Sequence, residues 1–499
     1  MMKLRTHQEA AKRIGQEIHA GIRNSKFLTA LVTPGGGKTL MASLFAHELL
    51  RGDVDRVLII CPRVTLQRQM RDGFTVPALG LNGQVDVGHQ STMKLLNRGL
   101  DGCVTSYQDL LNSKSQKKWL QFVSEMPTLV VLDEAHHLQA ADWFGPESAE
   151  ETGWTASVAP LVDAAKRVLI MTGTMTRDSG ARIAFVSYDP KTREPAIDIK
   201  YTRRDALDEQ AITNVSVKIC DGEARYWHRF GAQRHLLQNA SGEEEKRSLR
   251  ALIVDEAYRN SVIDEALKEF AQYRSMRNAR ARMIIVCANQ EHARDVDKYL
   301  KSDGSYRSVL AISNESDSHR RLSRFRDKRE GDILITVAMA HEGFDVPDCT
   351  HLVALTQIRA RAWLEQAFSR VTRFDREAQM SWEEQCAYLY APSDHSMMSF
   401  LAEWIDEQDA RFGEPPAPVT AANQPRGATT FSPISGQMTG TMYADTFGIL
   451  SEPDQKRIVL VDRKYPFLGH HPVVERLKVA RGEWPKDDCL PGLAEVSPV

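Results

Sequence analysis

The sequence predicts an α/β protein built from two similar units, each a parallel sheet covered by helices. Short apolar runs without polar alternation recur along the chain, and such runs suit strands that are buried on both faces of a sheet. Helix-patterned segments separate these runs, and strands that alternate with helices are typical of the α/β class. The pattern fades near residue 189 and begins again near residue 282. We therefore expect one domain at 1–190 and a second at 191–395.

Each expected strand is a short segment composed largely of apolar and β-branched or aromatic residues. In the first domain these segments are 27–33, 56–62, 103–107, 128–134 and 167–173. In the second domain they are 282–288, 332–338, 350–356 and 387–392. Between the two sets, an extended linker, a docking strand at 214–221 and a helical segment near 222–281 are expected from the local composition.

The C-terminal fifth of the chain has a weaker pattern. Residues 412–446 are rich in Pro, Gly, Ser and Thr, which predicts a linker or loop. We therefore expect residues 396–499 to form a linker and a small C-terminal extension, to which the sequence assigns no role. A protein partner that docks on this extension is one interpretation.

Composition excludes several classes of protein. The formal net charge is −2, so nucleic-acid binding is not indicated by overall charge, although a local groove can still be basic. The seven cysteines form no C-x-x-C pair, which disfavours a zinc site or a disulfide framework. No apolar run is long enough to span a bilayer, and the first residues lack a secretory signal pattern. A cytoplasmic location is expected.

The stretch TPGGGKT (33–39) has the features of a phosphate-binding loop. It follows an expected strand and precedes an amphipathic helix, which is the context a P-loop requires. Glycines let backbone N–H groups approach phosphate oxygens at a helix N-terminus. A flexible turn with an incidental lysine is the alternative, and the full P-loop pattern has Gly where this chain has Val32. The candidate nucleotide-binding residues are Pro34, Gly35, Gly36, Gly37, Lys38 and Thr39.

A second motif, VVLDEAHH (130–137), is an apolar strand that ends in two carboxylates. Asp133, together with Thr39, could hold Mg²⁺, and Glu134 could orient and deprotonate the attacking water. An acidic turn at a strand end is the alternative, and the phosphate loop upstream makes it less favoured. Lys38 would contact the β- and γ-phosphates of ATP.

A third motif supplies two arginines. Gln366, Arg370 and Arg373 are spaced i, i+4 and i+7, which would place them on one face of a helix. Such arginines could reach a γ-phosphate across a cleft, and arginine fingers accelerate phosphoryl transfer by about 10³–10⁵. A basic, solvated helix face is the alternative, both here and for the stretch HRRLSRFRDKRE (319–330).

With these motifs in order, residues 3–395 resemble superfamily 2 helicases and translocases of the DEAD/DEAH-box kind. DEAH (133–136) is the family's motif II, and TPGGGKT is similar to motif I. The segments CPRVTLQRQ (61–69), TGT (172–174), IIVCANQEHA (284–293), ITVAMAHEGFDVP (335–347) and EQAFSRVTR (365–373) resemble further motifs. The pattern is most similar to the motor subunits of type I and type III restriction enzymes and to related DNA-repair helicases. The family usually has Gly in place of Ser369.

The resemblance implies roles for further residues. Arg5 and Gln8 belong to the segment that contacts adenine, and Gly343 and Asp345 to a second nucleotide-binding segment. Residues that couple hydrolysis to the strand contacts would be His136, Thr172, Gly173 and Thr174. Residues on the nucleic-acid side would be Pro62, Arg63, Gln69, Thr105 and Gln108.

The resemblance further implies two tandem RecA-like P-loop domains that hold ATP and Mg²⁺ in a cleft, with catalytic roles for Glu134, Lys38, Arg370, Arg373 and Gln366. We expect an ATP hydrolase that moves along or unwinds nucleic acid, with DNA favoured over RNA. A duplex translocase that does not unwind, an ATP-gated sensor or clamp in a multi-protein complex, and an inactive relative are the alternatives. The sequence does not predict the oligomeric state.

Overall fold

The computed structural model describes residues 3–409 and 432–444, apart from a set of gaps. The gaps are 63, 77–78, 80, 82, 88–99, 141–152, 176–181, 229–230, 238–239, 241, 314–316, 338–345 and 383. The chain divides into two compact units, the first formed by Met1–Ala211 with Ala360–Gln366 and the second by Ile212–Arg359 with Ala367–Val499. The division falls about twenty residues later than the boundary expected from the sequence.

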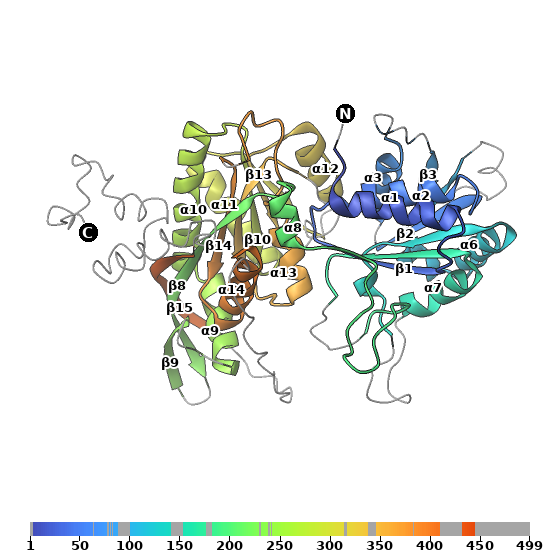
Figure 1. Cartoon of the computed structure of the whole chain (residues 1–499). Helices are drawn as coiled ribbons and strands as arrows, with labels where there is room; N and C mark the ends of the chain where they lie inside the picture. The colour runs from blue at the N-terminus through green and yellow to red at the C-terminus, as the bar shows by residue number, and fades with distance from the viewer. Residues whose placement is uncertain are drawn as a thin grey trace, which may run out of the picture. The chain divides into compact units, whose positions relative to one another are not determined.

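The first unit is a parallel sheet between two layers of helices (Figure 1). Its strands follow the order β3-β4-β2-β5-β6-β1-β7 across the sheet. In chain order they are β1 (Phe27–Val32), β2 (Arg56–Cys61), β3 (Val85–Val87), β4 (Gly102–Ser106), β5 (Thr128–Leu132), β6 (Arg167–Thr172) and β7 (Ile199–Tyr201). The helices are α1 (Thr6–His19), α2 (Lys38–Leu49), α3 (Val64–Gly73), α5 (Tyr107–Leu110), α6 (Ser113–Glu125), α7 (Gly153–Ala164) and α8 (Arg203–Asp208).

The second unit has a larger sheet in the order β11-β12-β10-β13-β14-β8-β15, with β9 paired to β8. Its strands are β8 (Asn214–His228), β9 (Gly231–Leu236), β10 (Arg282–Cys287), β11 (Ser308–Ala311), β12 (Ile333–Thr336), β13 (Cys349–Leu355), β14 (Cys386–Pro392) and β15 (Ser432–Ala444). Its helical segments are α9 (Gly242–Val254), α10 (Glu256–Met276), α11 (Gln290–Asp303), α12 (Ser318–Lys328), α13 (Arg361–Phe368) and α14 (His395–Asp409). The first residues of α13 group with the first unit.

The two sheets have the same topology. The strands of the two units can be matched one to one so that their orders across the sheet are identical. In this matching β1 corresponds to β8, and β2 to β7 correspond in sequence order to β10 to β15. Two differences stand out. β9 is an additional strand, and β15 runs antiparallel to β8 whereas β7 runs parallel to β1.

The predicted α/β class is confirmed, because each expected strand lies in one of two parallel sheets flanked by helices. The central strands β2, β5, β6, β10 and β13 are buried along their whole length. A strand that is covered on both faces has no polar side, so an unbroken apolar run predicts its position correctly.

Three expectations need correction. The segment near 222–281 begins as strand, since β8 extends to His228 and β9 follows it, and helix starts at Gly242. The expected linker at 412–446 contains β15, which pairs with β8 over Val217–Trp227. Both errors arise because a strand that pairs antiparallel at a sheet edge needs no apolar run.

The third correction concerns the arginines of the third motif. Helix α13 ends at Phe368, so Arg370 and Arg373 do not share a helix face with Gln366. After Phe368 the chain forms a turn in which Arg370 N donates to Ala367 O at 3.2 Å. Arg373 then forms an isolated β-bridge with Ile212. The β-branched Val371 and Thr372 favour this extended exit over further helix.

Candidate functional site: the phosphate loop and the acidic strand end of the first unit

The glycine loop joins the carboxyl end of β1 to the first turn of α2. Gly35 and Gly37 adopt φ angles of 87° and 94°, in the left-handed region that glycine enters at little cost. A Cβ at Gly36 would lie 2.8 Å from Val32 Cγ1. Val32, the residue that departs from the P-loop pattern, therefore occupies the space that Gly36 leaves open.

Residues at the start of α1 contact the glycine loop. One guanidinium nitrogen of Arg5 donates to Gly36 O at 2.5 Å and to Gly35 O at 3.3 Å. Gln8 is buried, and its Oε1 accepts from Arg5 N at 3.0 Å. The side-chain nitrogen of Gln8 lies 2.8 Å from the position a Cβ would take at Gly37. Arg5 and Gln8, both predicted nucleotide-binding residues, thus touch the predicted phosphate loop.

The two carboxylates follow β5, which is separated from β1 by β6 in the sheet. β5 ends at Leu132, and Asp133 N still donates to Ile60 O at 2.9 Å, which fixes Asp133 at the end of the sheet. Glu134 has φ 48° and ψ 49°, a conformation uncommon for a residue with a Cβ. This turn directs the Glu134 carboxylate to the Lys38 ammonium, with which it forms an ion pair. Strained backbone of this kind is frequent at functional sites.

The two carboxyl groups have opposite electrostatic environments. Burial raises the pKa of Asp133 to about 7, despite the attraction of Lys38. Burial also acts to raise the pKa of Glu134, but the Lys38 and His136 charges outweigh it and lower that pKa to about 2. Glu134 is thus ionised, whereas Asp133 Oδ1 is buried without a hydrogen-bond partner among the described residues.

An unpartnered buried carboxylate oxygen fits a hard cation, because oxygen ligands and a compensating charge are what Mg²⁺ requires. Thr39, the other predicted ligand, is partly buried in the first turn of α2. The loop glycines, Lys38 and Asp133 together suit a nucleotide phosphate chain with its cation.

His136 connects the acidic strand end to the next strand. Its Nδ1 lies 3.1 Å from Thr172 Oγ1 at the end of β6, and 3.4 Å from Glu134 Oε2. Thr172 Oγ1 in turn donates to Thr174 O at 2.8 Å. The Nε2 atoms of Gln366 and His136 are 3.3 Å apart. The predicted coupling residues therefore form one connected polar group with Glu134 at its start.

Gly173 lies in the same group for a steric reason. A Cβ there would approach Pro34 Cγ to 3.1 Å, so the glycine lets the turn after β6 pass close to the phosphate loop.

Several residues around the site had no predicted role. Tyr107 is fully buried and donates to Asp133 O at 2.9 Å. His7 packs on Tyr201 with ring centroids 4.0 Å apart, and the Tyr201 hydroxyl donates to Glu209 at 2.9 Å. Glu209 also accepts from Thr6 N at 3.0 Å, which ties the linker after β7 to the start of α1. His7 lies inside the adenine-contact segment and could have been noticed there, but nothing in the linker sequence indicates Tyr201 or Glu209.

The predicted nucleic-acid residues divide by exposure. Gln69 and Gln108 are exposed, whereas Pro62 and Thr105 are buried, and Arg63 lies outside the described residues. The Thr105 hydroxyl donates to Asp109 at 3.0 Å, and Asp109 also accepts from the Trp119 indole at 3.0 Å. These bonds favour a positioning role for Thr105 over direct contact with a polymer. The predicted residues Gly343 and Asp345 also lie outside the described residues.

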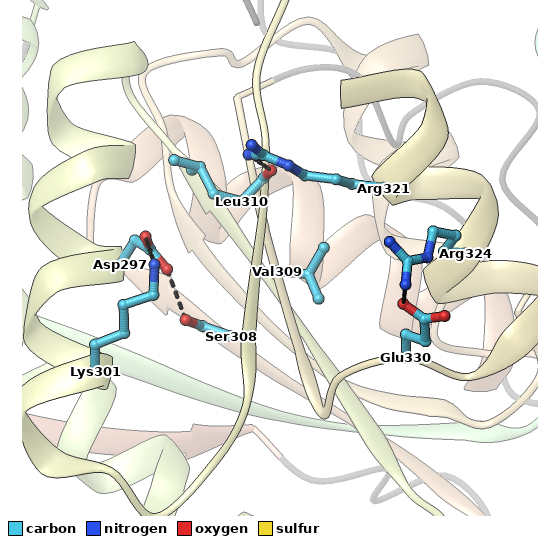
Figure 2. A pocket seen from close by; sticks show the side chains of 8 residues that line it. All are labelled: Asp297, Lys301, Ser308, Val309, Leu310, Arg321, Arg324 and Glu330. Atoms are coloured by element: carbon cyan, nitrogen blue, oxygen red, sulfur yellow. Dashed lines mark hydrogen bonds and ion pairs between the residues drawn. The ribbon is translucent and has the colours of Figure 1, made fainter. Parts of the chain in front are cut away.

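The second unit has a separate polar cavity of about 410 Å³ (Figure 2). It lies between α11, the edge strand β11 and α12. Four of its charged groups form two ion pairs, Lys301 with Asp297 at 2.7 Å and Arg324 with Glu330 at 2.6 Å. Arg321 donates to Leu310 O at 3.2 Å. Part of the basic stretch 319–330 is therefore neutralised within its own unit, as the solvated-face alternative expects.

Comparison with known proteins agrees with the motif order. Residues 1–177 match the family model of the type III restriction enzyme res subunit, and residues 261–375 match the helicase conserved C-terminal domain. These two matches, together with the two parallel-sheet units, support the resemblance to superfamily 2 helicases with tandem RecA-like domains that are related to the motor subunits of restriction enzymes. The predicted resemblance is confirmed.

Two uncharacterized proteins from two strains of Mycobacterium tuberculosis are each 26% identical to the chain over 405 residues, or 80% of its length. The chain spans 63% of the length of these curated relatives. A solved fragment assigned to the HsdR subunit of a type I restriction enzyme from Vibrio vulnificus has 18% identity and a TM-score of 0.51, covering 79% of this chain and 64% of the fragment. That likeness is one of fold.

Of the helices in the described part of the chain, none combines the length and the apolar character that crossing a bilayer demands.

Proposed function

We propose that this chain is an ATP-dependent motor that hydrolyses ATP to move along or unwind nucleic acid, with DNA as the favoured polymer. The observation that carries the proposal is the ion pair of Lys38 with Glu134 beside the buried Asp133, whose Oδ1 has no hydrogen-bond partner among the described residues. These residues come from the ends of two strands of one parallel sheet, and ligands of such sheets bind at the carboxyl ends of the strands. The resemblance of the chain to helicases supports the same assignment.

Each residue has a role that its surroundings support. The backbone N–H groups of the loop and the first turn of α2 would bind phosphate oxygens. Lys38 would move from Glu134 to the β- and γ-phosphates, because both are anionic partners for one ammonium. Glu134, ionised and then released from Lys38, would accept a proton from the attacking water. Asp133 and Thr39 would hold Mg²⁺, which when bound neutralises charge on the phosphates.

Two further groups complete the proposed cycle. His136 contacts Glu134 and Thr172, so a change in the contacts of Glu134 on ATP hydrolysis would be transmitted through His136 to the turn 172–174. Arg370 and Arg373 would stabilise charge on the transferred phosphoryl group. The protein would bind the polymer mainly through its phosphates, so binding would be independent of base sequence and sensitive to salt.

The proposal is tested by ATP turnover at one fixed salt concentration, without polymer and then with single-stranded DNA, duplex DNA, forked DNA or RNA. Strong stimulation by one polymer is expected and identifies the track. Stimulation by duplex without strand separation on the fork would indicate the duplex translocase. Equal turnover under all conditions would contradict the motor and favour an ATP-gated clamp.

A further inference from the structure

The Arg5 side chain contacts the glycine loop, although the sequence places Arg5 in a segment expected to contact adenine. Arg5 immediately precedes the first turn of α1, and its backbone is extended, with φ −83° and ψ 158°. One guanidinium nitrogen donates to the carbonyl oxygens of both Gly35 and Gly36, and the bond to Gly36 O is the shorter, at 2.5 Å. Arg5 is therefore bound to the backbone of the phosphate loop itself.

A hydrogen bond to a loop carbonyl also fixes the direction of the next backbone N–H. A peptide bond is planar and trans, so the C=O of one residue and the N–H of the following residue point in opposite directions. Because Arg5 holds Gly36 O, the Gly37 N–H points away from Arg5. Gly36 N donates to Thr33 O at 2.9 Å, whereas no described residue accepts a hydrogen bond from Gly37 N. The Gly37 N–H thus remains available to a phosphate oxygen.

Tyr201 of β7 contacts the same part of the loop. Its ring atom Cδ1 lies 3.0 Å from the position that a Cβ at Gly36 would take. Its carbonyl oxygen accepts from Thr33 N at 2.9 Å, and its side chain is buried. Gly36 is therefore in contact with two side chains, those of Arg5 and Tyr201, which leave its peptide little freedom to rotate.

Glu209 fixes the start of α1, from which Arg5 extends. One oxygen of the Glu209 carboxylate accepts from Thr6 N at 3.0 Å and from the Thr6 hydroxyl, and the other accepts from the Tyr201 hydroxyl at 2.9 Å. Thr6 N belongs to the first turn of α1, whose N–H groups have no partner inside the helix. One carboxylate thus connects the residue next to Arg5 with the tyrosine that packs on the loop.

We infer that Arg5 is a positioning residue of the phosphate loop, which directs the Gly37 N–H to the phosphates, and that Glu209 keeps Arg5 in place. This inference rests on the ATP site of the proposed function and deepens it. A residue that acts through the loop affects every ligand that carries a triphosphate chain. A residue that contacts adenine affects only the ligands that carry this base.

Arg5→Ala distinguishes these two roles by calorimetric titration with three magnesium-bound ligands. The ligands are a non-hydrolysable ATP analogue, the corresponding GTP analogue and inorganic tripolyphosphate. The variant should bind all three more weakly by a similar factor of about tenfold or more, as expected when a hydrogen bond of a charged group is lost. The matched control is Arg13→Ala, an exposed arginine of the same helix, which should change each affinity by less than about twofold.

Arg5 also carries a positive charge, and a second titration separates this charge from its hydrogen bonds. In 1 M salt the Debye length is about 3 Å, so attraction of the anion through space is largely screened. The affinity ratio of wild type to Arg5→Ala should therefore stay similar in 1 M salt. A ratio that falls to one would assign Arg5 to attraction of the anion and overturn the positioning role.

Glu209→Ala tests the support of Arg5 at an exposed residue, where little destabilisation of the fold is expected. It should weaken binding of the three ligands by a similar factor of about threefold or more. The effects of Arg5→Ala and Glu209→Ala should be clearly less than additive, because Glu209 acts through Arg5. Glu209→Gln keeps a carbonyl oxygen for Thr6 N and should restore most of the affinity. Asp208→Ala, which changes the neighbouring exposed carboxylate, should bind like the wild type.

The outcomes separate this inference from the proposed motor. Weaker binding of the ATP analogue alone, with tripolyphosphate bound normally, would overturn the inference and assign Arg5 to the base. Wild-type affinity of Arg5→Ala for all three ligands would overturn it as well. Wild-type protein that binds the ATP analogue but shows no stimulation by any polymer would contradict the motor, while the affinities of the variants would still decide the role of Arg5. Wild-type protein that binds none of the ligands would overturn both.

Discussion

The two units share one sheet topology but use the end of the first strand differently. In the first unit β1 stops at Val32, and a tight glycine loop leads at once into α2. In the second unit β8 continues to His228 and turns back as β9 before the first helix begins. The same position in the fold thus holds a backbone loop suited to phosphate in one unit and an antiparallel strand pair in the other.

This difference shows how one topology can carry two different local structures at the same strand end. The loop of the first unit relies on backbone conformation, with positive φ angles at Gly35 and Gly37 and no room for a side chain at Gly36. The β8–β9 pair of the second unit relies instead on hydrogen bonds between two antiparallel strands. A loop of backbone N–H groups at a helix N-terminus suits a compact phosphate chain.

The substitution with the largest expected effect tests whether the second unit contributes to catalysis. Replacing Arg370 with Ala should lower kcat for ATP by about 10³–10⁵, the usual value of an arginine finger, with a smaller change in KM. The matched control is Arg376→Ala, an exposed arginine nearby, which should leave turnover near the wild-type value. Wild-type kcat in Arg370→Ala would confine the chemistry to the first unit.

The next effect tests the phosphate loop itself. Lys38→Ala removes one charged hydrogen-bond donor, worth about 1.5–3 kcal/mol, so ATP should bind about 10- to 150-fold more weakly. Isothermal titration with a non-hydrolysable ATP analogue measures this change. Arg13→Ala, an exposed change on the neighbouring helix α1, is the control, and equal affinity in Lys38→Ala and wild type would contradict the assignment of the loop.

A steric test sharpens the contrast between the glycine loop and the β8–β9 strand pair. Gly36→Ala should destabilise the first unit by about 1–3 kcal/mol, the usual range for overpacking, because the new methyl group meets Val32 Cγ1 at 2.8 Å. Adding Val32→Gly should cost less stability in the Gly36→Ala background than in the wild type, as measured by denaturant unfolding. Strictly additive effects of the two changes would show that Val32 does not occupy the space left by Gly36.

The smallest effect concerns the core of the second unit. His351 is fully buried, stacked on Tyr388 at 4.6 Å, and burial lowers its pKa to about 3. Because the folded state resists protonation while the unfolded state titrates near pH 6.5, the stability that neutral His351 provides is complete above pH 6.5 and declines below it. The loss should reach about 2 kcal/mol at pH 5.

Denaturant unfolding at pH 7.5 and pH 5.0 measures this effect, with His351→Phe as the comparison. The variant should lose less stability than the wild type between the two pH values. An equal loss in both proteins would mean that His351 is protonated in the fold, or that other groups, such as His292 in the same unit, dominate the acid response.

The sequence was sufficient for the central strands and the order of the motifs, because strands buried on both faces carry unbroken apolar runs. It did not reveal β9 or β15, whose polar and glycine-containing sequences belong to strands at the edge. The proximity of Lys38 and Glu134 was predictable, since both follow parallel strands of one sheet. The end of α13 before Arg370 was not, because that end depends on the pairing of Arg373 with Ile212, a residue distant in sequence.

The residues that pack around the site could not be predicted from the sequence either. Tyr201 and Glu209 lie in what the sequence presents as a linker, and their contacts with His7 and Thr6 exist only once the chain returns to α1. Likewise, the ion pair of Lys38 depends on the left-handed backbone of Glu134, and no sequence pattern indicates a positive φ at a glutamate.

The most direct test of the central claim, that Glu134 activates water at the phosphate loop, compares Glu134→Gln with the wild type in ATP binding and in single-turnover hydrolysis. The variant should bind ATP with near wild-type affinity, because Lys38 stays available to the phosphates, while hydrolysis should slow by about 10²–10⁴. Hydrolysis at the wild-type rate in Glu134→Gln would contradict the account and assign the base to another residue.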